Sequence, residues 1–289
     1  YGLSIINSHL LAGATLLLTS KSLLEKGFWD FFREQKATSF GGVPYTYEIL
    51  KKLRFFRMDL PSLRTMTQAG GKLTPELTRE IAEFAAIRNI RFVVMYGQTE
   101  ATARMAFLPH EKALEKCGSM GVPIPGGRFD LIDAGGRCIA ESDVTGELVY
   151  YGPNVALGYA ECGEDLAKGD EWGGVLMTGD MAMRDQDGFY YITGRKKRFL
   201  KIFGNRVNLD ETERLVKAQF EGMDCACAGR DDQMSVFITN ANMAKRVLDF
   251  LVDKTGLNPV AFVAYVVDRI PKNETGKILY AELEKLLER

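Results

Sequence analysis

The chain has 289 residues, enough for one large domain or two of ordinary size, and it can bury roughly 75% of its unfolded surface without disulfide staples. It carries 37 basic and 38 acidic residues for a net charge of −1, which excludes a general attraction to nucleic acid or acidic membranes. Its apolar runs, such as residues 16–18, fall far short of the roughly 20 residues that a membrane span needs, and five cysteines without a Cys-x-x-Cys pair predict reduced thiols in the cytoplasm.

Strand-like and helix-like segments alternate over residues 1–117. Apolar runs predict strands at 14–19, 37–41, 63–69 and 91–96. Amphipathic patterns predict helices at 23–32, 45–53 and 75–87, the last with Thr74 as its cap and Pro75 at its first position. This alternation is typical of βαβ units, so we expect an α/β unit with a parallel sheet.

From about Gly118 the pattern changes to short β-like runs at 129–132, 147–151 and 189–192, separated by turn-rich segments at 134–136, 143–146 and 185–188. A tight turn is also expected before Asp180, in Thr178-Gly179-Asp180. The short runs predict a small antiparallel sheet or barrel over 118–194. Beyond it, a helix capped by Asn208, strands at 235–239 and 262–268, and helices at 243–254 and 279–287 predict an α+β unit over 195–289.

A polar segment, Tyr96-Gly97-Gln98-Thr99-Glu100, follows the strand predicted at 91–96. Open α/β sheets bind ligands at the carboxyl ends of their strands. The segment offers an aromatic face, a glycine for close approach, a hydroxyl and a carboxylate, which suit a base, a phosphate and a metal ion. The alternative is a polar loop with a helix cap at Thr99.

Three later segments also admit more than one interpretation. Asp180 can accept two ribose hydroxyls, because an ionised carboxylate only accepts, or it is a β-turn aspartate. Residues 194–206 contain six basic side chains, which suit phosphate binding, a nucleic-acid patch or a solvated linker; the near-neutral net charge and the few flanking aromatics argue against nucleic acid. Lys277 follows a turn-forming loop that can project its point charge, although a lysine beside a loop glycine is common.

The order of these segments resembles the adenylate-forming superfamily, which includes acyl-CoA and aryl-CoA synthetases, adenylation domains of nonribosomal peptide synthetases and firefly-type luciferases. Four segments match in order: Tyr-Gly-Gln-Thr-Glu at 96–100, Thr-Gly-Asp at 178–180, Gly-Arg with the following Lys, Gly and Arg at 194–206, and Pro-Lys-x3-Gly-Lys at 271–277. Weaker matches are Gly-Gly at 70–71, the stretch 146–159 and Asp-Gly-Phe at 187–189. The resemblance covers essentially the whole chain.

The resemblance implies an enzyme that joins a carboxylate to AMP from MgATP, releases pyrophosphate, and passes the acyl group to the thiol of CoA or of a carrier-protein pantetheine. It implies that Tyr96 stacks on adenine and that Thr99 contacts the α-phosphate. Glu100 would hold Mg²⁺, a hard cation that bridges phosphates. Gly97 belongs to the same nucleotide-binding segment, and Gly70 and Gly71 would let the adenine and the acyl group approach the backbone closely.

The resemblance also implies that Asp180 and Arg195 hold the ribose hydroxyls. Lys277 would orient the carboxylate and stabilise charge that develops on the α-phosphate, which is electrostatic and not proton chemistry. The small C-terminal domain swings between two poses in this family. Lys197 would be its hinge, Gly204 would line the pantetheine tunnel, and Arg206 would be a charge partner near phosphate.

The sequence departs from the family in one respect, because residues 1–289 contain no glycine- and hydroxyl-rich phosphate loop ending in Pro-Lys. Residues 39–44 match instead a later segment that helps to line the acyl pocket, which would draw on 40–47, 68–72 and 95–102. We therefore expect a fragment comprising the back part of the large AMP-binding domain at 1–117, a barrel-like β subdomain at 118–194 and a mobile lid at 195–289. We expect this fragment alone to be inactive in the activation of a carboxylate, and to self-associate through an exposed core edge.

The residues leave three functions open. The first is a stand-alone ligase of the acyl-CoA synthetase type, which the short stretch after Lys277 favours, because no carrier-protein domain follows it. The second is a ligase that loads an amino or fatty acid onto a carrier protein. The third is a truncated, non-catalytic protein that binds a nucleotide or a partner; the missing phosphate loop favours it, and the joint presence of Glu100, Asp180 and Lys277 argues against it.

Overall fold

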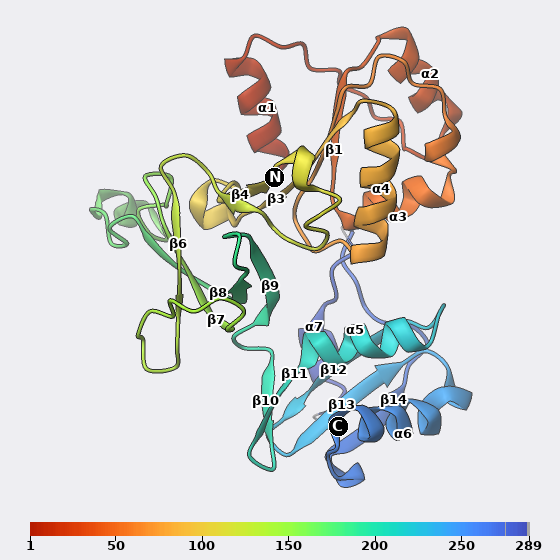
Figure 1. Cartoon of the computed structure of the whole chain (residues 1–289), viewed down its shortest axis with the longest axis vertical. Helices are drawn as coiled ribbons and strands as arrows, with labels where there is room; N and C mark the ends of the chain where they lie inside the picture. Colours follow the sequence, from red (N-terminus) through yellow and green to blue (C-terminus); the bar gives the residue numbers. More distant parts are fainter. Residues whose placement is uncertain (275, 288–289) are drawn as a thin grey trace. The chain divides into compact units, whose positions relative to one another are not determined.

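The structure is a computed structural model that describes residues 1–274 and 276–287 (Figure 1). The chain divides into two compact units. Unit 1 comprises residues 1–178 and 182–192, and unit 2 comprises residues 179–181 and 193–289. Both units mix helices with sheets, as the α/β and α+β patterns predict.

Unit 1 contains a five-stranded sheet in the order β1-β2-β3-β4-β5. Strands β1 (Ser39–Gly42), β2 (Thr65–Gln68) and β3 (Arg91–Tyr96) are parallel neighbours. Strands β4 (Ala106–Leu108) and β5 (Val122–Pro123) continue the sheet in antiparallel pairing. The parallel strands therefore all end at one edge, and the loops that leave them meet there.

The helices of unit 1 either precede β1 or connect the parallel strands. They are α1 (Gly2–Leu11), α2 (Lys26–Glu34), α3 (Pro44–Lys52) and α4 (Pro75–Ile87). The predicted cap of α4 is confirmed, since Thr74 Oγ1 accepts a 3.2 Å hydrogen bond from the Leu77 amide. Aromatic side chains of α2 and of the turn after α3 fill the core, with Trp29 and Phe55 rings 5.7 Å apart and both buried.

The second sheet has the order β6-β7-β8-β9, with β6 (Arg128–Ile132), β7 (Gly146–Tyr151), β8 (Val175–Arg184) and β9 (Tyr190–Arg195). Within the described residues this sheet stays open, with β6 and β9 at its edges, so of the two predicted forms, a small sheet or a barrel, the structure has the open sheet. The turn predicted at Thr178-Gly179-Asp180 is wrong, because these residues lie within β8. Gly179 keeps a left-handed φ of +68° within the strand, which is the local feature that resembles a turn.

Unit 2 begins its regular structure with a hairpin of β10 (Phe199–Ile202) and β11 (Asn205–Asn208). A sheet of β12 (Cys225–Arg230), β13 (Gln233–Ile238) and β14 (Phe262–Val266) follows, antiparallel between the first two and parallel between the last two. Helices α5 (Leu209–Gln219), α6 (Ala244–Thr255) and α7 (Tyr280–Glu284) complete it. The predicted Asn208 cap is confirmed: its Oδ1 accepts from the Asp210 amide at 2.9 Å and the Glu211 amide at 3.1 Å.

Short 3-10 helices occupy several connections: η1 (Phe55–Arg57), η2 (Thr99–Ala101), η3 (His110–Lys112), η4 (Gly163–Ala167), η5 (Ala241–Met243) and η6 (Pro259–Ala261). No helix in the part of the chain that the structure describes has the length and apolar character needed to cross a bilayer.

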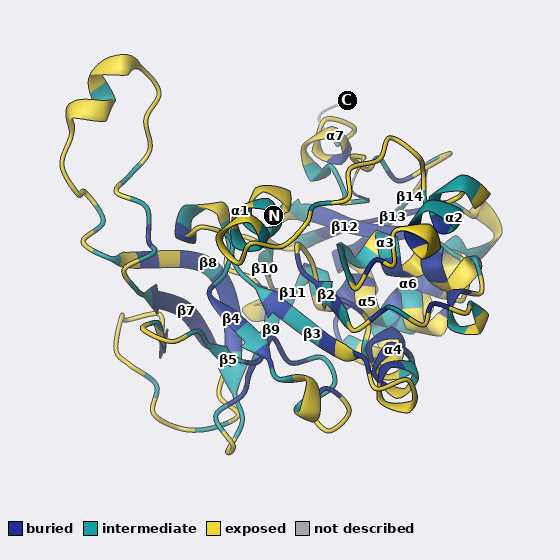
Figure 2. Ribbon diagram, turned by 90° about the horizontal axis from the view of Figure 1, so that it is seen from above, coloured by how far each residue is buried: buried dark blue, intermediate teal, exposed yellow. Residues whose placement is uncertain are grey.

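The strand predicted at 14–19 does not form. These residues have no regular structure, and Leu18 is 80% exposed. Helix α1, which precedes them, buries none of its side chains and includes the exposed Leu3 and Leu11 (Figure 2). An apolar run becomes a strand only when another strand pairs with it, and no described strand pairs with this one.

Candidate active site

The segment at 96–102 leaves the carboxyl end of β3, where the parallel strands end. It turns through η2 and returns to the sheet, where the Met105 amide donates a 2.9 Å bond to the Tyr96 carbonyl. Thr99 is exposed, and Tyr96 and Glu100 are half-buried. Ligands of open α/β sheets bind at this edge, so the three side chains with predicted roles stand where a ligand can reach them.

Glu100 is held from both its backbone and its side chain. Its carbonyl accepts a 2.8 Å bond from the Ala156 amide, and its Oε1 accepts a 2.7 Å bond from the Tyr159 hydroxyl. No described residue bonds to Oε2. The described residues also contain no group of three acidic, His or Cys side chains around a common point. One free carboxylate oxygen fits Mg²⁺, which binds proteins through one or two carboxylates and takes its other oxygens from phosphates and water.

A second clamp fixes the segment after Glu100, and nothing local in the sequence signals it. The amide of Asn154 donates to the carbonyls of Ala101 at 2.8 Å and of Arg104 at 2.9 Å. The buried Tyr150 hydroxyl donates to Asn154 Oδ1 at 2.8 Å and orients that amide. The stretch 146–159, recognised only as a weak match, thus holds the loop that carries Glu100.

Glycines make the close turns at this edge. Gly97 packs so tightly that a Cβ there would lie 2.4 Å from the Ala103 carbonyl oxygen, so closure of the loop requires glycine whether or not a nucleotide binds. Gly70 and Gly71 follow β2, and a Cβ on Gly71 would lie 3.0 Å from Pro44. The loops after β1 and β2 therefore touch at these two glycines.

In unit 2 the structure brings together the two residues with predicted ribose roles. Asp180 Oδ1 lies 3.1 Å from Arg195 Nε, and Asp180 is only 4% exposed. The amide of Lys196 donates to the Gly179 carbonyl at 2.8 Å, which ties the segment after Arg195 to that of Asp180. A carboxylate has several lone pairs, so Asp180 can bond Arg195 and still accept from hydroxyl groups.

Arg198, one of the six basic residues of 194–206, is a structural residue. Its guanidinium donates to Asp210 at 2.9 Å, to Glu213 at 2.5 Å and to the Cys227 carbonyl at 2.7 Å. It also stacks 3.6 Å from the centre of the Tyr280 ring, whose hydroxyl donates to Glu213 at 3.0 Å. This buried cluster joins the start of unit 2 to α5, β12 and α7.

Replacing Arg198 by methionine should lower the free energy of unfolding of unit 2 by about 3–5 kcal/mol, because it leaves the 8% exposed Glu213 carboxylate without its cation. Urea unfolding measures the change. Arg214→Met is the matched control: its pair with Glu211 is solvent-exposed, and such pairs contribute about 0–1 kcal/mol. Equal losses in the two variants would contradict a structural role for Arg198.

The other predicted residues of unit 2 are exposed or lie at turns. Lys197 is exposed between β9 and β10, and Gly204 has φ +83° in the tight β10–β11 turn. Arg206 lies in β11 opposite Lys201, and its side chain falls outside the described part of the structure. Lys277 is exposed, and its amide donates to Asn273 Oδ1 at 3.0 Å, which shapes the loop that carries it.

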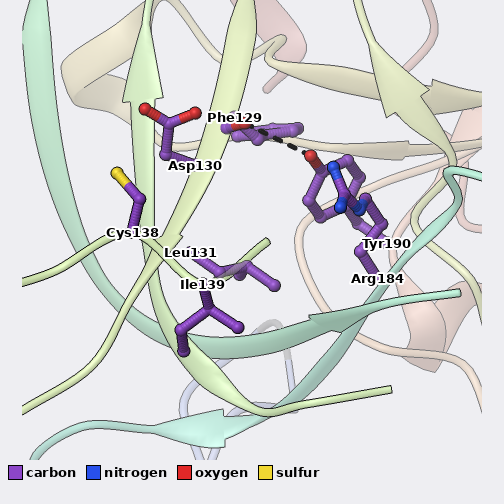
Figure 3. Close-up of a pocket in the computed structure, with 7 residues that line it drawn as sticks. All are labelled: Phe129, Asp130, Leu131, Cys138, Ile139, Arg184 and Tyr190. Atoms are coloured by element: carbon purple, nitrogen blue, oxygen red, sulfur yellow. Dashed lines mark hydrogen bonds between the residues drawn. The ribbon is translucent and has the colours of Figure 1, made fainter. Parts of the chain in front are cut away.

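A pocket on the second sheet includes none of the predicted residues (Figure 3). The Tyr190 hydroxyl crosses one side of it to donate to the Phe129 carbonyl at 3.2 Å. The residues that line it are Phe129, Asp130, Leu131, Cys138, Ile139, Arg184 and Tyr190.

The mixed sheet and the polar segment at its carboxyl edge are features of a nucleotide-binding enzyme, and comparison with known proteins identifies the family. The family model described as "AMP-binding enzyme" matches residues 1–160. The chain belongs to this family. A 4-coumarate–CoA ligase-like protein of Arabidopsis thaliana is 29% identical over 80% of this chain and 42% of its own length. A 2-succinylbenzoate–CoA ligase of Bacillus cytotoxicus is 26% identical over 99% of this chain and 60% of its own.

Solved structures share the fold. The o-succinylbenzoate CoA synthetase of Bacillus subtilis, in complex with an acyl-adenylate intermediate, matches 98% of this chain and 58% of its own, with a TM-score of 0.77 at 22% identity. The same enzyme has been solved with ATP and a magnesium ion. The chain thus spans about half the length of the curated relatives that it matches.

Proposed function

We propose that this chain provides adenylate-binding and lid portions of an AMP-forming acid–thiol ligase of the acyl-CoA synthetase type. The observation that carries the proposal is the Tyr-Gly-Gln-Thr-Glu segment at the carboxyl end of β3, in a chain that belongs to the AMP-binding enzyme family. The names of the relatives as CoA ligases support CoA as the thiol, in preference to a carrier-protein pantetheine.

The proposed reaction has two halves. In the first, a carboxylate oxygen of the acid attacks the α-phosphorus of ATP, the bond from that phosphorus to the bridging oxygen breaks, and pyrophosphate leaves. In the second, the CoA thiol gives its proton to solvent, its sulfur bonds to the acyl carbon, the bond from that carbon to the phosphate oxygen breaks, and AMP leaves. Both halves build negative charge on oxygens around the α-phosphorus or the acyl carbon, so catalysis requires fixed positive charges and hydrogen-bond donors.

Unit 1 would bind the base and the α-phosphate. Tyr96 offers its ring to adenine, the exposed Thr99 hydroxyl donates to the α-phosphate, and Glu100 would hold Mg²⁺ through the oxygen that Tyr159 leaves free. Mg²⁺, when bound, offsets the charge of the phosphates. Gly70 and Gly71 keep side chains away from the ligand at the end of β2.

Unit 2 would bind the ribose and supply the mobile cation. Asp180 accepts the two ribose hydroxyls while its contact with Arg195 holds it in place. Lys277 neutralises charge on the reacting oxygens, with Arg206 as a further charge near phosphate. We propose that residues 195–289 move as a lid about Lys197 and that Gly204 lines the thiol tunnel in one of its poses.

Two further expectations concern the surroundings of the protein. All five cysteines are free thiols, which supports a reducing compartment such as the cytoplasm. Exposed leucines of α1 and of the segment after it support self-association, since exposed apolar side chains favour contact with other chains. They include Leu3, Leu10, Leu11, Leu18 and Leu24.

The binding of AMP to Asp180 variants tests the proposed function. Asp180→Asn keeps the size of the side chain but removes the charge that accepts from the ribose, so the Kd for AMP in isothermal titration should rise about 10- to 100-fold. Asp249→Asn, an exposed carboxylate of α6, is the control and should leave the Kd unchanged. Equal affinity in both variants would contradict the ribose role of Asp180.

A further inference from the structure

Arg104 is a cation that forms no ion pair with any residue that the structure describes. It follows the 96–102 segment and is half-buried, and its one side-chain hydrogen bond is a 3.3 Å contact from Nη2 to the Ser8 hydroxyl of α1. Its Nε is buried and bonds to none of the described residues. An arginine is always charged, and a partly buried charge that lacks a counter-charge costs free energy.

Two partly buried cations elsewhere in this chain are paired with carboxylates. Lys116, whose side chain is 11% exposed, contacts the carboxylates of Asp185 and Asp187. Arg198, whose side chain is 12% exposed, contacts Asp210 and Glu213. Against these, no carboxylate among the described residues lies within ion-pair distance of Arg104, so its charge is available to an anionic group of a ligand.

Hydroxyl groups lie beside Arg104 at the carboxyl half of the parallel strands. The Tyr1 and Thr67 hydroxyls bond to each other at 2.8 Å, and a Cβ on Gly41 would lie 2.7 Å from both of them. Burial raises the pKa of the Tyr1 hydroxyl, and the positive charge of Arg104 acts on it in the opposite direction. One of these two hydroxyls donates to the other, so the second retains a hydrogen for another acceptor. We call Tyr1, Ser8, Thr67 and Arg104 the Arg104 cluster.

We propose that the Arg104 cluster binds a second carboxylate on the acid that the ligase activates, so that the substrate is a dicarboxylic acid held by one end and adenylated at the other. The inference rests on the proposed function. The adjacent Nε and Nη2 of a guanidinium match the two oxygens of a carboxylate, and this paired geometry gives both strength and orientation. The cluster lies at the strand ends from which the Thr99 and Glu100 loop also leaves, so a short acyl chain links the two sites.

Stable adenylate analogues test this proposal on residues 1–289, because they need no triphosphate. Adenosine 5′-sulfamates, N-acylated with chains of four to eight carbons, are made in pairs that end in a carboxylate or in a methyl group, and their Kd values are measured by isothermal titration beside that of AMP. At one or more lengths the carboxylate-ended analogue should bind at least about 10-fold more tightly. Arg104→Met should bring that ratio close to one while the Kd for AMP stays the same.

Arg91→Met removes a positive charge at the amino end of β3 and should preserve the preference, which controls for net charge. If AMP binds but the two analogues of every pair bind equally, the dicarboxylate inference is wrong and the proposed function stands. If Arg104→Met weakens AMP as much as both analogues, Arg104 contacts the α-phosphate and the inference is overturned. If neither AMP nor any analogue binds, the proposed function fails and the inference fails with it.

Discussion

Lys277→Ala is expected to slow adenylate formation by more than about 100- to 1,000-fold, because one preorganised electrostatic partner in an active site contributes that much and a full charge contributes more. ATP–pyrophosphate exchange measures this half-reaction, in a form of the enzyme that carries a phosphate loop ahead of Tyr1. Thioester formation from added acyl-AMP should be far less affected. Lys285→Ala, an exposed lysine close by in the chain, is the control and should leave exchange unchanged.

The opposite pattern is expected at Gly204. A Cβ there would meet nothing within 4 Å, so unit 2 itself accommodates a side chain, but φ +83° strains most residues. Asparagine tolerates this left-handed conformation, so Gly204→Asn adds a side chain with little strain. It should preserve exchange and obstruct thioester formation. Gly222→Asn is a matched control, because Gly222 has φ +79° and equally open surroundings.

These two variants examine whether unit 2 serves the two half-reactions with different residues. If Lys277→Ala and Gly204→Asn lose the same half-reaction, the lid does not alternate between two poses. If Gly222→Asn behaves like Gly204→Asn, the effect comes from the backbone and not from a thiol tunnel.

Residues 1–289 alone should show no detectable ATP–pyrophosphate exchange with fatty, aryl, amino or dicarboxylic acids. The chain contains no phosphate loop, so Glu100 and Lys277 face a triphosphate whose β- and γ-phosphates have no backbone donors to hold them in line. A displacement of about 1 Å already lowers a rate on the order of 100-fold. AMP should still bind, since Tyr96, Thr99 and Asp180 are all present.

Measuring the mass in solution beside the exchange separates the causes. Exchange by a monomer would mean that a segment interpreted as structural holds the phosphates. Exchange only in an oligomer would mean that a second copy supplies the missing hydrogen-bond donors. Substitution of the exposed Leu3 or Leu11 of α1 would then be the way to disrupt the oligomer.

The sequence correctly predicted those elements of the fold whose formation depends on residues close together in the chain. The apolar run at 91–96 became β3, and Thr74-Pro75 marked the start of α4, because propensity and capping act within a few residues. Residues 14–19 look as apolar but formed no strand, since strand formation depends on a partner elsewhere in the chain. For Thr178-Gly179-Asp180 the error was the opposite one: the local sequence resembles a turn, but the structure places these residues within strand β8.

In the candidate site, too, the sequence predicted the local motif but not the distant residues that support it. The motif placed Glu100 at a strand end, yet its support comes from Asn154 and Tyr159, more than 50 positions away, and no local pattern links them. Lys197 and Arg198 are adjacent cations in the sequence and differ only in their surroundings. Asp210 and Glu213 make Arg198 structural, while Lys197 stays exposed.

Whether the chain is part of an acid–thiol ligase is tested most directly by measuring the second half-reaction on residues 1–289. This half-reaction involves neither pyrophosphate nor the phosphate loop. Supplied with synthetic acyl-AMP and CoA, the chain should form acyl-CoA and AMP faster than the uncatalysed reaction, and Gly204→Asn should abolish the gain while Gly222→Asn preserves it. Release of AMP that does not depend on CoA, or no acceleration at all while acyl-AMP binds, would show that the chain binds an adenylate without being part of an acid–thiol ligase.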